Sequence, residues 1–445
     1  MTTTDAETTS MTTFRQTELG DHRVVLASTG ADGPEPVMTA VDGWRLSTAI
    51  RQANDQRIPF VLTLSTAGLA VEDGIGAAAA WGGAARELVQ SSGVVPTIAV
   101  VSGPVVSGPA LLLGLFDIVI LTSDSYVYVN GPGNVETYTG VPISGLELGG
   151  TSTHLRSTGL ASLLTGTVDE ALNLIGEILG HLPSSVDHLP PVIETADPAD
   201  RLCPDVGDLL PDTPAGSYDV RAVITAVVDD GHFLELRAAW SPNLVTGFAA
   251  LGGHSVGIVA NQTQSLAGSI DISAAQKGAR FVAMCDAFNV PLITMVDTSG
   301  FLPGKDLEWR GMIRHGAQMA FAYARATVPR IGLTLRKSYG GAYIVMDSVN
   351  MGNDLMLAWP SAEVAVMGAK GAVEILHRSS SPEERTELVA GYEAQYLTPY
   401  PAAERSSITA VIDPADTRAE LVAGLRMLNS KRERLPGRRH DNTPL

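Results

Sequence analysis

Short apolar runs, each entered through proline and left through a turn of small residues, recur along the chain. Residues 58–68 and 290–300 are two such runs, and in each of them a glycine lies nine positions after the proline. An apolar run of this length between turn residues is typical of a strand buried in a parallel sheet. A helix-like stretch follows each run, and a second apolar run is then entered at Val95-Pro96 or at Val328-Pro329. This alternation predicts an α/β fold with mainly parallel sheets.

The second apolar run of each set leads into a glycine-containing bend, which we call an elbow. Twelve positions separate Pro96 from Gly108 in the first elbow, and twelve separate Pro329 from Gly341 in the second. Apolar, helix-like stretches follow both elbows. The same order of features at the same spacing indicates two copies of one architecture.

The agreement continues beyond the elbows. Fourteen positions separate Asp117 from Gly131, and fourteen separate Asp354 from Gly368. Only the stretch after the elbow differs, with nine positions from Gly108 to Asp117 and thirteen from Gly341 to Asp354. The chain is therefore predicted to be a tandem duplication.

The proline-rich stretch between about residues 184 and 220 predicts the joint between the two copies. We expect a first domain at 15–210 and a second at 211–445. Residues 1–14 are rich in threonine and lack both the positive flank and the apolar run of a signal peptide. They are expected to be disordered.

Composition excludes several classes of function. A formal net charge of −18 argues against a nucleic-acid surface, which requires a basic face. Two cysteines and histidines without ligand spacing give neither a disulfide framework nor a metal site. No apolar run reaches the roughly 20 residues of a membrane-spanning helix. We therefore expect a cytoplasmic protein that binds no metal, nucleic acid or membrane.

The elbows are the candidate sites for chemistry. A strand that ends in a glycine turn and opens a helix leaves backbone N–H groups unpaired, and these can stabilise an oxyanion. The second elbow, 338–343, suits this role, whereas the first contains Pro109, which has no N–H. Either elbow alone could be a packing turn. Two elbows at matching places in a repeat favour a function.

Three further runs lie between the elbows and the C-terminus, at 256–262, 297–304 and 358–363. Together with the elbows, they resemble the carboxyltransferase (beta) subunits of propionyl-CoA and acetyl-CoA carboxylases, from about Ile58 to the C-terminus. These enzymes are members of the crotonase-like superfamily. The resemblance implies two tandem crotonase-like (ClpP/crotonase) domains.

The resemblance also implies a reaction and its site. A carboxyl group passes from carboxybiotin, held by a partner, to the alpha carbon of a short acyl thioester, and no side-chain base is needed. By position, the amides of Ser107 and Gly108 would hold the thioester enolate, and those of Gly341 and Ala342 the biotin enolate. Further residues expected to bind substrate are Gly340, Tyr343, Ile344, His154 and Gly131.

Partners and specificity follow from the same resemblance. A biotin carboxylase or biotin carrier subunit is expected, within a homo- or hetero-hexamer whose sites are shared between the N half of one chain and the C half of another. Propionyl-preferring relatives carry Asp where this chain has Ile344, so a relaxed choice of acyl length is expected.

The departures from the family lie in the first half. The family's opening region is largely missing, its Gly-Gly elbow has become Ser107-Gly108, and its charged turn has become residues 65–70 without charge. Residues 1–210 hold eight arginines and no lysine for the phosphates of coenzyme A. Three alternatives therefore stay open: an acceptor other than a coenzyme A thioester, a catalytically silent scaffold subunit, and a biotin-independent acyl-CoA decarboxylase.

Overall fold

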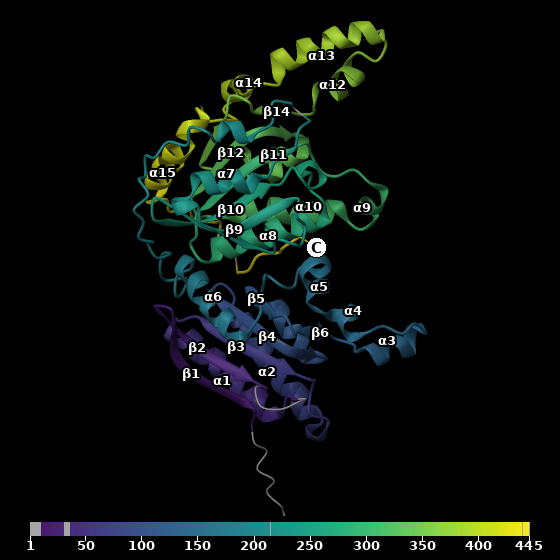
Figure 1. The fold of residues 1–445 in the computed structure, drawn as a ribbon, viewed down its shortest axis with the longest axis vertical. Coiled ribbons are helices and arrows are strands. Elements are labelled where there is room, and N and C mark those ends of the chain that lie inside the picture. Colours follow the sequence, from purple (N-terminus) through teal and green to yellow (C-terminus); the bar gives the residue numbers. More distant parts are fainter. Residues whose placement is uncertain (1–9, 31–35, 214, 438, 445) are drawn as a thin grey trace, which may run out of the picture. The chain divides into compact units, whose positions relative to one another are not determined.

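The computed structural model describes residues 10–30, 36–213, 215–437 and 439–444. The chain forms two compact units, Met1–Pro190 and Pro191–Leu445, drawn in purple to blue and in teal to yellow in Figure 1. This division falls within the proline-rich stretch of about residues 184–220 in which the joint was predicted. Residues 191–210 belong to the second unit, because Cys203 and Val206 are buried in its core.

The predicted disordered tail is only partly described. Residues 1–9 of that segment lie outside the described residues. The first strand, β1 (Thr12–Leu19), begins inside the segment and pairs with β2 along its whole length, from Thr12 opposite Thr29 to Leu19 opposite His22.

The first unit is built on a seven-stranded sheet in the order β1-β2-β3-β4-β5-β7, and β6 pairs with the end of β4. β1 and β2 form an antiparallel hairpin, and all the other neighbours are parallel. The remaining strands are β2 (His22–Thr29), β3 (Phe60–Thr66), β4 (Thr97–Val106), β5 (Ile118–Thr122), β6 (Tyr126–Tyr128) and β7 (Leu163–Thr165).

The second unit is built on an eight-stranded sheet in the order β15-β13-β12-β11-β10-β9-β8, and β14 pairs with the end of β12. β8, β9 and β10 are antiparallel, and the others are parallel. These strands are β8 (Phe233–Leu236), β9 (Leu244–Leu251), β10 (His254–Asn261), β11 (Leu292–Thr298), β12 (Arg330–Tyr339), β13 (Leu355–Ala358), β14 (Glu363–Ala365) and β15 (Ala410–Val411).

The duplication is confirmed at the level of sheet pairing. A hairpin leads into the same run of parallel strands in both units, and a short extra strand joins the end of the elbow strand in each. The register between β3 and β4 shifts between Leu64 and Thr66, and that between β11 and β12 shifts between Val296 and Thr298. These shifts fall at matching places, just before the elbows.

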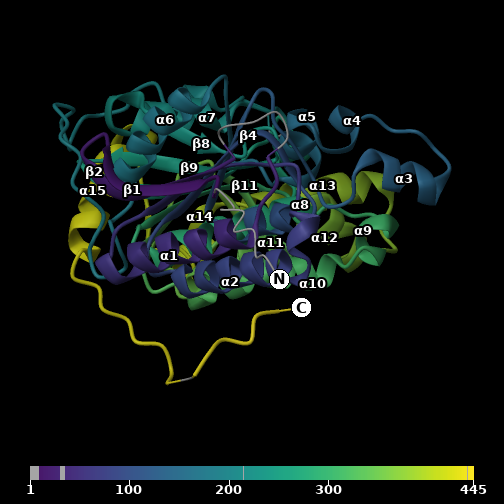
Figure 2. The same ribbon diagram turned by 90° about the horizontal axis from the view of Figure 1, so that it is seen from below.

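Helices repeat as well. The pair α1 (Ala40–Gln56) and α2 (Ile75–Ser91) lie side by side in the first unit (Figure 2), and α8 (Ile272–Ala287) packs on α10 (Met312–Arg325) in the second. The last helix of each unit is α6 (Val168–His181) or α15 (Thr417–Leu428). The other helices are α3 (Pro132–Thr139), α4 (Gly145–Gly149), α5 (Thr151–Thr153), α7 (Val220–Val227), α9 (Lys305–Trp309), α11 (Gly340–Val345), α12 (Ala369–Leu376), α13 (Pro382–Tyr396) and α14 (Pro399–Glu404).

The strands are buried because both faces of each sheet are covered, as the unbroken apolar runs predicted. Every residue of β9 and of β11 is buried. One core in each unit joins these strands to their helices. Among the described residues no helix is long and apolar enough to cross a membrane.

The start of α1 is fixed by a buried carboxylate. Asp42 is fully buried and accepts hydrogen bonds from the Thr39 amide at 2.9 Å and the Thr39 hydroxyl at 2.6 Å. It also accepts from the Ser10 hydroxyl at 2.7 Å and the Thr12 amide at 2.8 Å, which ties β1 to α1. Burial raises the pKa of Asp42, but these hydrogen bonds outweigh it and hold the pKa below its usual value.

Asp42→Asn should lower the melting temperature, and the loss should depend on pH. An amide cannot accept all four hydrogen bonds, so we expect a cost of about 1–3 kcal/mol at neutral pH. Because the folded-state pKa is depressed, the carboxylate stabilises the fold above its unfolded pKa, and this contribution disappears as the pH falls through the folded value. Tm measured from pH 7 to pH 3 should show the gap between wild type and variant closing.

Asp55→Asn is the matched control, since Asp55 is exposed on the same helix. It should leave Tm nearly unchanged at every pH. A gap for Asp42→Asn that stays constant down to pH 3 would contradict the role of its carboxylate.

Candidate active site

The second elbow joins β12 to α11. Gly340 has a φ of +58°, a left-handed conformation that favours glycine, and a Cβ there would lie 3.1 Å from the Val366 carbonyl oxygen. The amides of Gly341 and Ala342 follow in the first turn, where a helix offers its N–H groups no partner, and neither amide donates to a backbone group outside the helix among the described residues. Gly341 is exposed, whereas Ala342 is fully buried. Of the two predicted donors, Gly341 is therefore the more exposed residue.

The first elbow has the same backbone but fewer open amides. Ser107 occupies the place of Gly340, with a φ of +65° that is unusual for a residue with a Cβ. Its amide donates to the Tyr128 carbonyl oxygen at 3.0 Å and so continues the pairing of β4 with β6. Gly108 comes next, followed by Pro109. The expected pair of donors at Ser107 and Gly108 is thus reduced to Gly108, because the sheet already uses the Ser107 amide.

A second turn borders each elbow. Gly68 and Gly300 follow β3 and β11 with φ values of +130° and +139°, and their carbonyls accept from the amides of Met38 and Ile270. A Cβ on Gly341 would lie 3.3 Å from the ring of Phe301. The sequence repeat gave the glycines of these turns, but it gave no sign that the Phe301 ring contacts the elbow.

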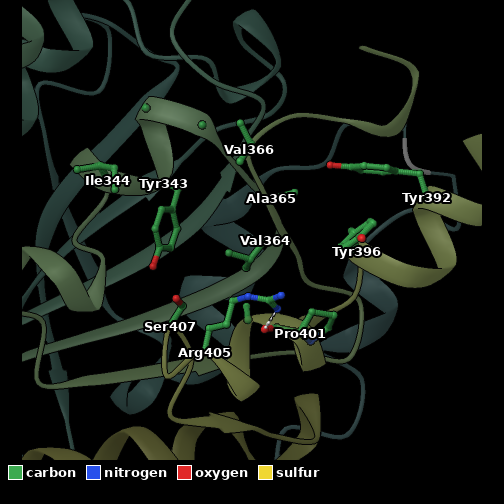
Figure 3. A pocket seen from close by; sticks show the side chains of 13 residues that line it. Tyr343, Ile344, Val364, Ala365, Val366, Tyr392, Tyr396, Pro401, Arg405 and Ser407 are labelled. Carbon is green, nitrogen blue, oxygen red and sulfur yellow. Dashed lines mark hydrogen bonds between the residues drawn. The ribbon is translucent and has the colours of Figure 1, made fainter. Parts of the chain in front are cut away.

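A cavity of about 570 Å³ opens beside the second elbow (Figure 3). Its lining is mostly apolar, and Arg405 is the charged residue in it. The predicted substrate residues Gly340, Tyr343 and Ile344 line it together with Gly341. The others are Val364, Ala365, Val366, Tyr392, Tyr396, Pro401, Ala402 and Ser407.

Polar groups of this cavity are few. The Tyr343 hydroxyl is buried and has no hydrogen-bond partner among the described residues, and in Figure 3 it points toward Ser407. The Arg405 guanidinium donates from Nη1 to the Pro401 carbonyl oxygen at 2.8 Å. The lining contains no carboxylate, histidine, lysine or cysteine. A reaction here would depend on hydrogen-bond donors and not on a side-chain base.

Comparisons with known proteins give the family. The model of the carboxyl transferase domain matches residues 28–443. The propionyl-CoA carboxylase carboxyltransferase subunit of Haloferax mediterranei is 40% identical over 408 residues, which cover 90% of this chain and 79% of that protein. The chain belongs to the carboxyl transferase family. It is a biotin-dependent carboxyltransferase of the acyl-CoA carboxylase type, as the sequence motifs predicted.

Two further relatives bear on what a carboxyltransferase of this kind can do. The alpha subunit of methylmalonyl-CoA decarboxylase from Veillonella parvula is 38% identical and covers 89% of this chain and 77% of that protein. A transcarboxylase 12S structure, described as a hexamer with methylmalonyl-coenzyme A and methylmalonic acid bound, superposes with a TM-score of 0.95 at 36% identity. The superposition covers 98% of this chain and 85% of the transcarboxylase chain. The predicted crotonase-like fold is thereby confirmed.

Two further residues expected to bind substrate in this carboxyltransferase, His154 and Gly131, have hydrogen bonds within the first unit. His154 is buried; its Nε2 lies 2.8 Å from the Val127 carbonyl oxygen and its Nδ1 lies 2.9 Å from the Thr158 hydroxyl. Both of its ring nitrogens are thus engaged within the first unit. Gly131 caps the start of α3, where its carbonyl accepts from the amides of Asn134 and Val135.

A buried ion pair joins the two strands of the carboxyltransferase that end at the second elbow. Asp297 on β11 accepts from Arg336 Nε at 3.0 Å and from the Lys337 amide at 3.2 Å. Burial raises the pKa of the Asp297 carboxyl, against the opposing effect of Arg336. The pair lies at the register shift between Val296 and Thr298. It therefore fixes the bulge from which the elbow departs.

Arg336→Met should lower the free energy of unfolding by about 3–5 kcal/mol, because it leaves the Asp297 carboxylate buried without its charge partner. The double variant Asp297→Asn/Arg336→Met should recover part of this loss, since no buried charge remains. Urea titration followed by circular dichroism measures both. Arg310→Met, which removes one partner of the exposed pair with Asp306, is the matched control and should change stability little. A double variant no more stable than Arg336→Met alone would speak against this interpretation.

Proposed function

We propose that this carboxyltransferase carries a carboxyl group from carboxybiotin to the alpha carbon of a short acyl-CoA of the acetyl or propionyl class, with an oxygen held at each elbow. One observation carries this proposal: Gly341 is exposed, lines a cavity, and has an amide for which no hydrogen-bond partner is found among the described residues. The Gly108 amide has the equivalent place in the first repeat, so one elbow suits the thioester oxygen and the other the ureido oxygen of biotin.

The cavity beside Gly341 fits a biotin ring. It is mostly apolar, as a fused bicyclic ring requires, and the Gly341 amide supplies a donor for a ureido oxygen. Carboxybiotin, when bound, supplies the carboxyl group and, once this has left, the base for the alpha proton. The residues of the chain hold the oxygens on which charge develops and exclude water with apolar side chains such as Val364 and Ile344.

Ile344 supports a broad choice of acyl group. It lines the cavity proposed for the biotin ring, where the alpha carbon of the acyl group must meet the carboxyl donor, and it brings no charge or hydrogen-bonding group. An apolar wall discriminates between acyl chains that differ by one methylene by only about 1–3 kcal/mol. We therefore propose that acetyl and propionyl thioesters are both accepted.

Assembly with other chains is part of the proposal. We infer a homo- or hetero-hexamer that works with a biotin carboxylase and a biotin carrier subunit. Exposed apolar side chains on the outlying helices support it: Tyr138 on α3 is 92% exposed, and Ile375 and Leu376 on α12 are 66% and 65% exposed. Figure 1 shows α12 and α13 reaching out from the body of the second unit. Such residues are covered when copies assemble.

Biotin-independent decarboxylation of an acyl-CoA is the second candidate. The likeness to a subunit of the methylmalonyl-CoA decarboxylase of Veillonella parvula favours decarboxylation, without bearing on the part played by biotin, because loss of a carboxyl group also generates an enolate that an elbow can hold. A silent scaffold, or an acceptor other than coenzyme A, is supported only by the altered first elbow.

Gly341→Val should abolish carboxyl transfer while the protein stays folded. A branched side chain would lie against the Phe301 ring and cover the amide, and loss of one oxyanion donor alone costs about 10²–10³-fold in kcat. Gly180→Val is the matched control, because a Cβ there meets no atom within 4 Å. Transfer is measured as carbon-14 fixed into acid-stable product. Turnover near the wild-type rate in Gly341→Val would rule out the role given to this amide.

A substrate panel separates the candidates. The purified chain is combined with biotin carboxylase and a biotinylated carrier, and then given acetyl-CoA, propionyl-CoA or the corresponding carrier-protein thioesters. Carboxylation of the coenzyme A thioesters supports the proposal. Carbon dioxide released from methylmalonyl-CoA in the absence of biotin supports the decarboxylase. Activity that requires a second carboxyltransferase chain supports the scaffold.

A further inference from the structure

The first elbow offers fewer hydrogen-bond donors than an oxyanion site needs. The Ser107 amide is taken by Tyr128, Pro109 has no N–H, and the Gly108 amide alone remains open in the described part of this elbow. Stabilisation of an enolate oxygen usually takes two or more donors aimed at one point. A second donor must therefore come from elsewhere if this elbow is to hold a thioester oxygen.

The indole ring of Trp81 lies beside Gly108 in the first elbow. Trp81 lies on α2, and the edge of its ring that carries the N–H faces Gly108. A Cβ on Gly108 would lie 3.0 Å from Trp81 Nε1, 3.1 Å from Cε2 and 3.3 Å from Cζ2. Glycine at this position thus lets the indole N–H approach the elbow backbone.

The core of the first unit holds the Trp81 ring in position, and no partner is found for its indole N–H among the described residues. Trp81 is half-buried and packs against the core of the first unit. An indole nitrogen can only donate, and no hydrogen bond from Trp81 is found among the described residues. The Trp81 N–H therefore lies beside the open Gly108 amide. Two donors in this arrangement can bind one oxygen between them.

The second repeat lacks this feature. Thirteen positions after the turn glycine, where the first repeat has Trp81, the second has Ile313, whose side chain is 84% exposed. The neighbour of Gly341 is the Phe301 ring, which has no N–H. The second elbow has instead an amide-bearing Ala342 where the first has Pro109. The indole is therefore a property of the first elbow, where the backbone falls short.

We propose that the Trp81 indole N–H is the second oxyanion donor of the first elbow and acts with the Gly108 amide on the thioester oxygen. The inference rests on the proposed function and assigns a catalytic residue to its thioester side. The hydrogen bond strengthens as negative charge gathers on that oxygen in the transition state. Its effect therefore falls on kcat more than on KM.

Trp81→Phe tests the proposal, since phenylalanine keeps an aromatic ring and removes the N–H. We expect kcat for carboxylation of propionyl-CoA to fall by about 10²-fold, with KM within a few-fold of wild type. Trp44→Phe is the matched control, because Trp44 lies exposed on the neighbouring helix α1 and should keep full activity. Thermal melting checks that both variants are folded. A Trp81→Phe variant as active as Trp44→Phe overturns the proposal.

A second measurement does not depend on turnover. In protein labelled with ¹⁵N at the indoles, the Trp81 resonance, assigned by its absence from Trp81→Phe, should shift on addition of propionyl-CoA. It should stay in place with coenzyme A, which has no thioester carbonyl. If it shifts but nothing is carboxylated, the proposed function fails and the donor role stands. A resonance that does not move at saturating propionyl-CoA overturns the donor role, and the carboxylation assay then decides the proposed function separately.

Discussion

The pairing of a short strand with the end of each elbow strand determines which backbone amides are free to bind an oxygen. In the first unit, β6 extends the ladder by one bond beyond β4, and the Ser107 amide is used there. The next residue, Gly108, leaves the sheet and begins the 3₁₀ helix Gly108–Leu115, where the first amides of a helix have no partner within it. Its amide is open for a geometric reason and not because of any side chain, and Gly341 likewise lies in the first turn of a helix in the second unit.

The two copies of this backbone have diverged in what surrounds the elbow. The second unit has the buried Asp297–Arg336 pair at the bulge, where the first has Ser65 and Gly103. It also has four more residues after the elbow, and Asp347 among them pairs with Arg330 at 2.6 Å, with both side chains buried. Buried charge pairs add little net stability but fix one arrangement when every partner is present. The second elbow is therefore held by ion pairs, while the first is bordered by an indole.

The sequence predicted the strands, the duplication and the elbow glycines, because each leaves a local mark: an unbroken apolar run, a repeated spacing or a residue suited to positive φ. It did not predict that β1 begins at Thr12 or that residues 191–210 pack with the second unit. Those outcomes depend on which distant residues pair, such as Asp42 with the Thr12 amide. The use of the Ser107 amide by Tyr128 depends on a three-residue strand too short to show a period. His154 was predicted to bind substrate because its sequence does not reveal its partners. Its ring contacts the Val127 carbonyl and the Thr158 hydroxyl, and the contact with Val127 depends on the tertiary fold.

The charge of the chain bears on why the site relies on oriented donors. With a net charge of −18, the surface field repels anions, and both coenzyme A and a carboxylated biotin are anionic. Long-range attraction cannot gather such substrates, so their affinity must come from contacts made at close range. Backbone amides, an indole N–H and a lone arginine in an apolar cavity act within hydrogen-bonding distance and are little screened by salt. Such a site stabilises the negative charge that forms on the reacting oxygen. It contributes little to binding of the anionic groups that the substrates already carry.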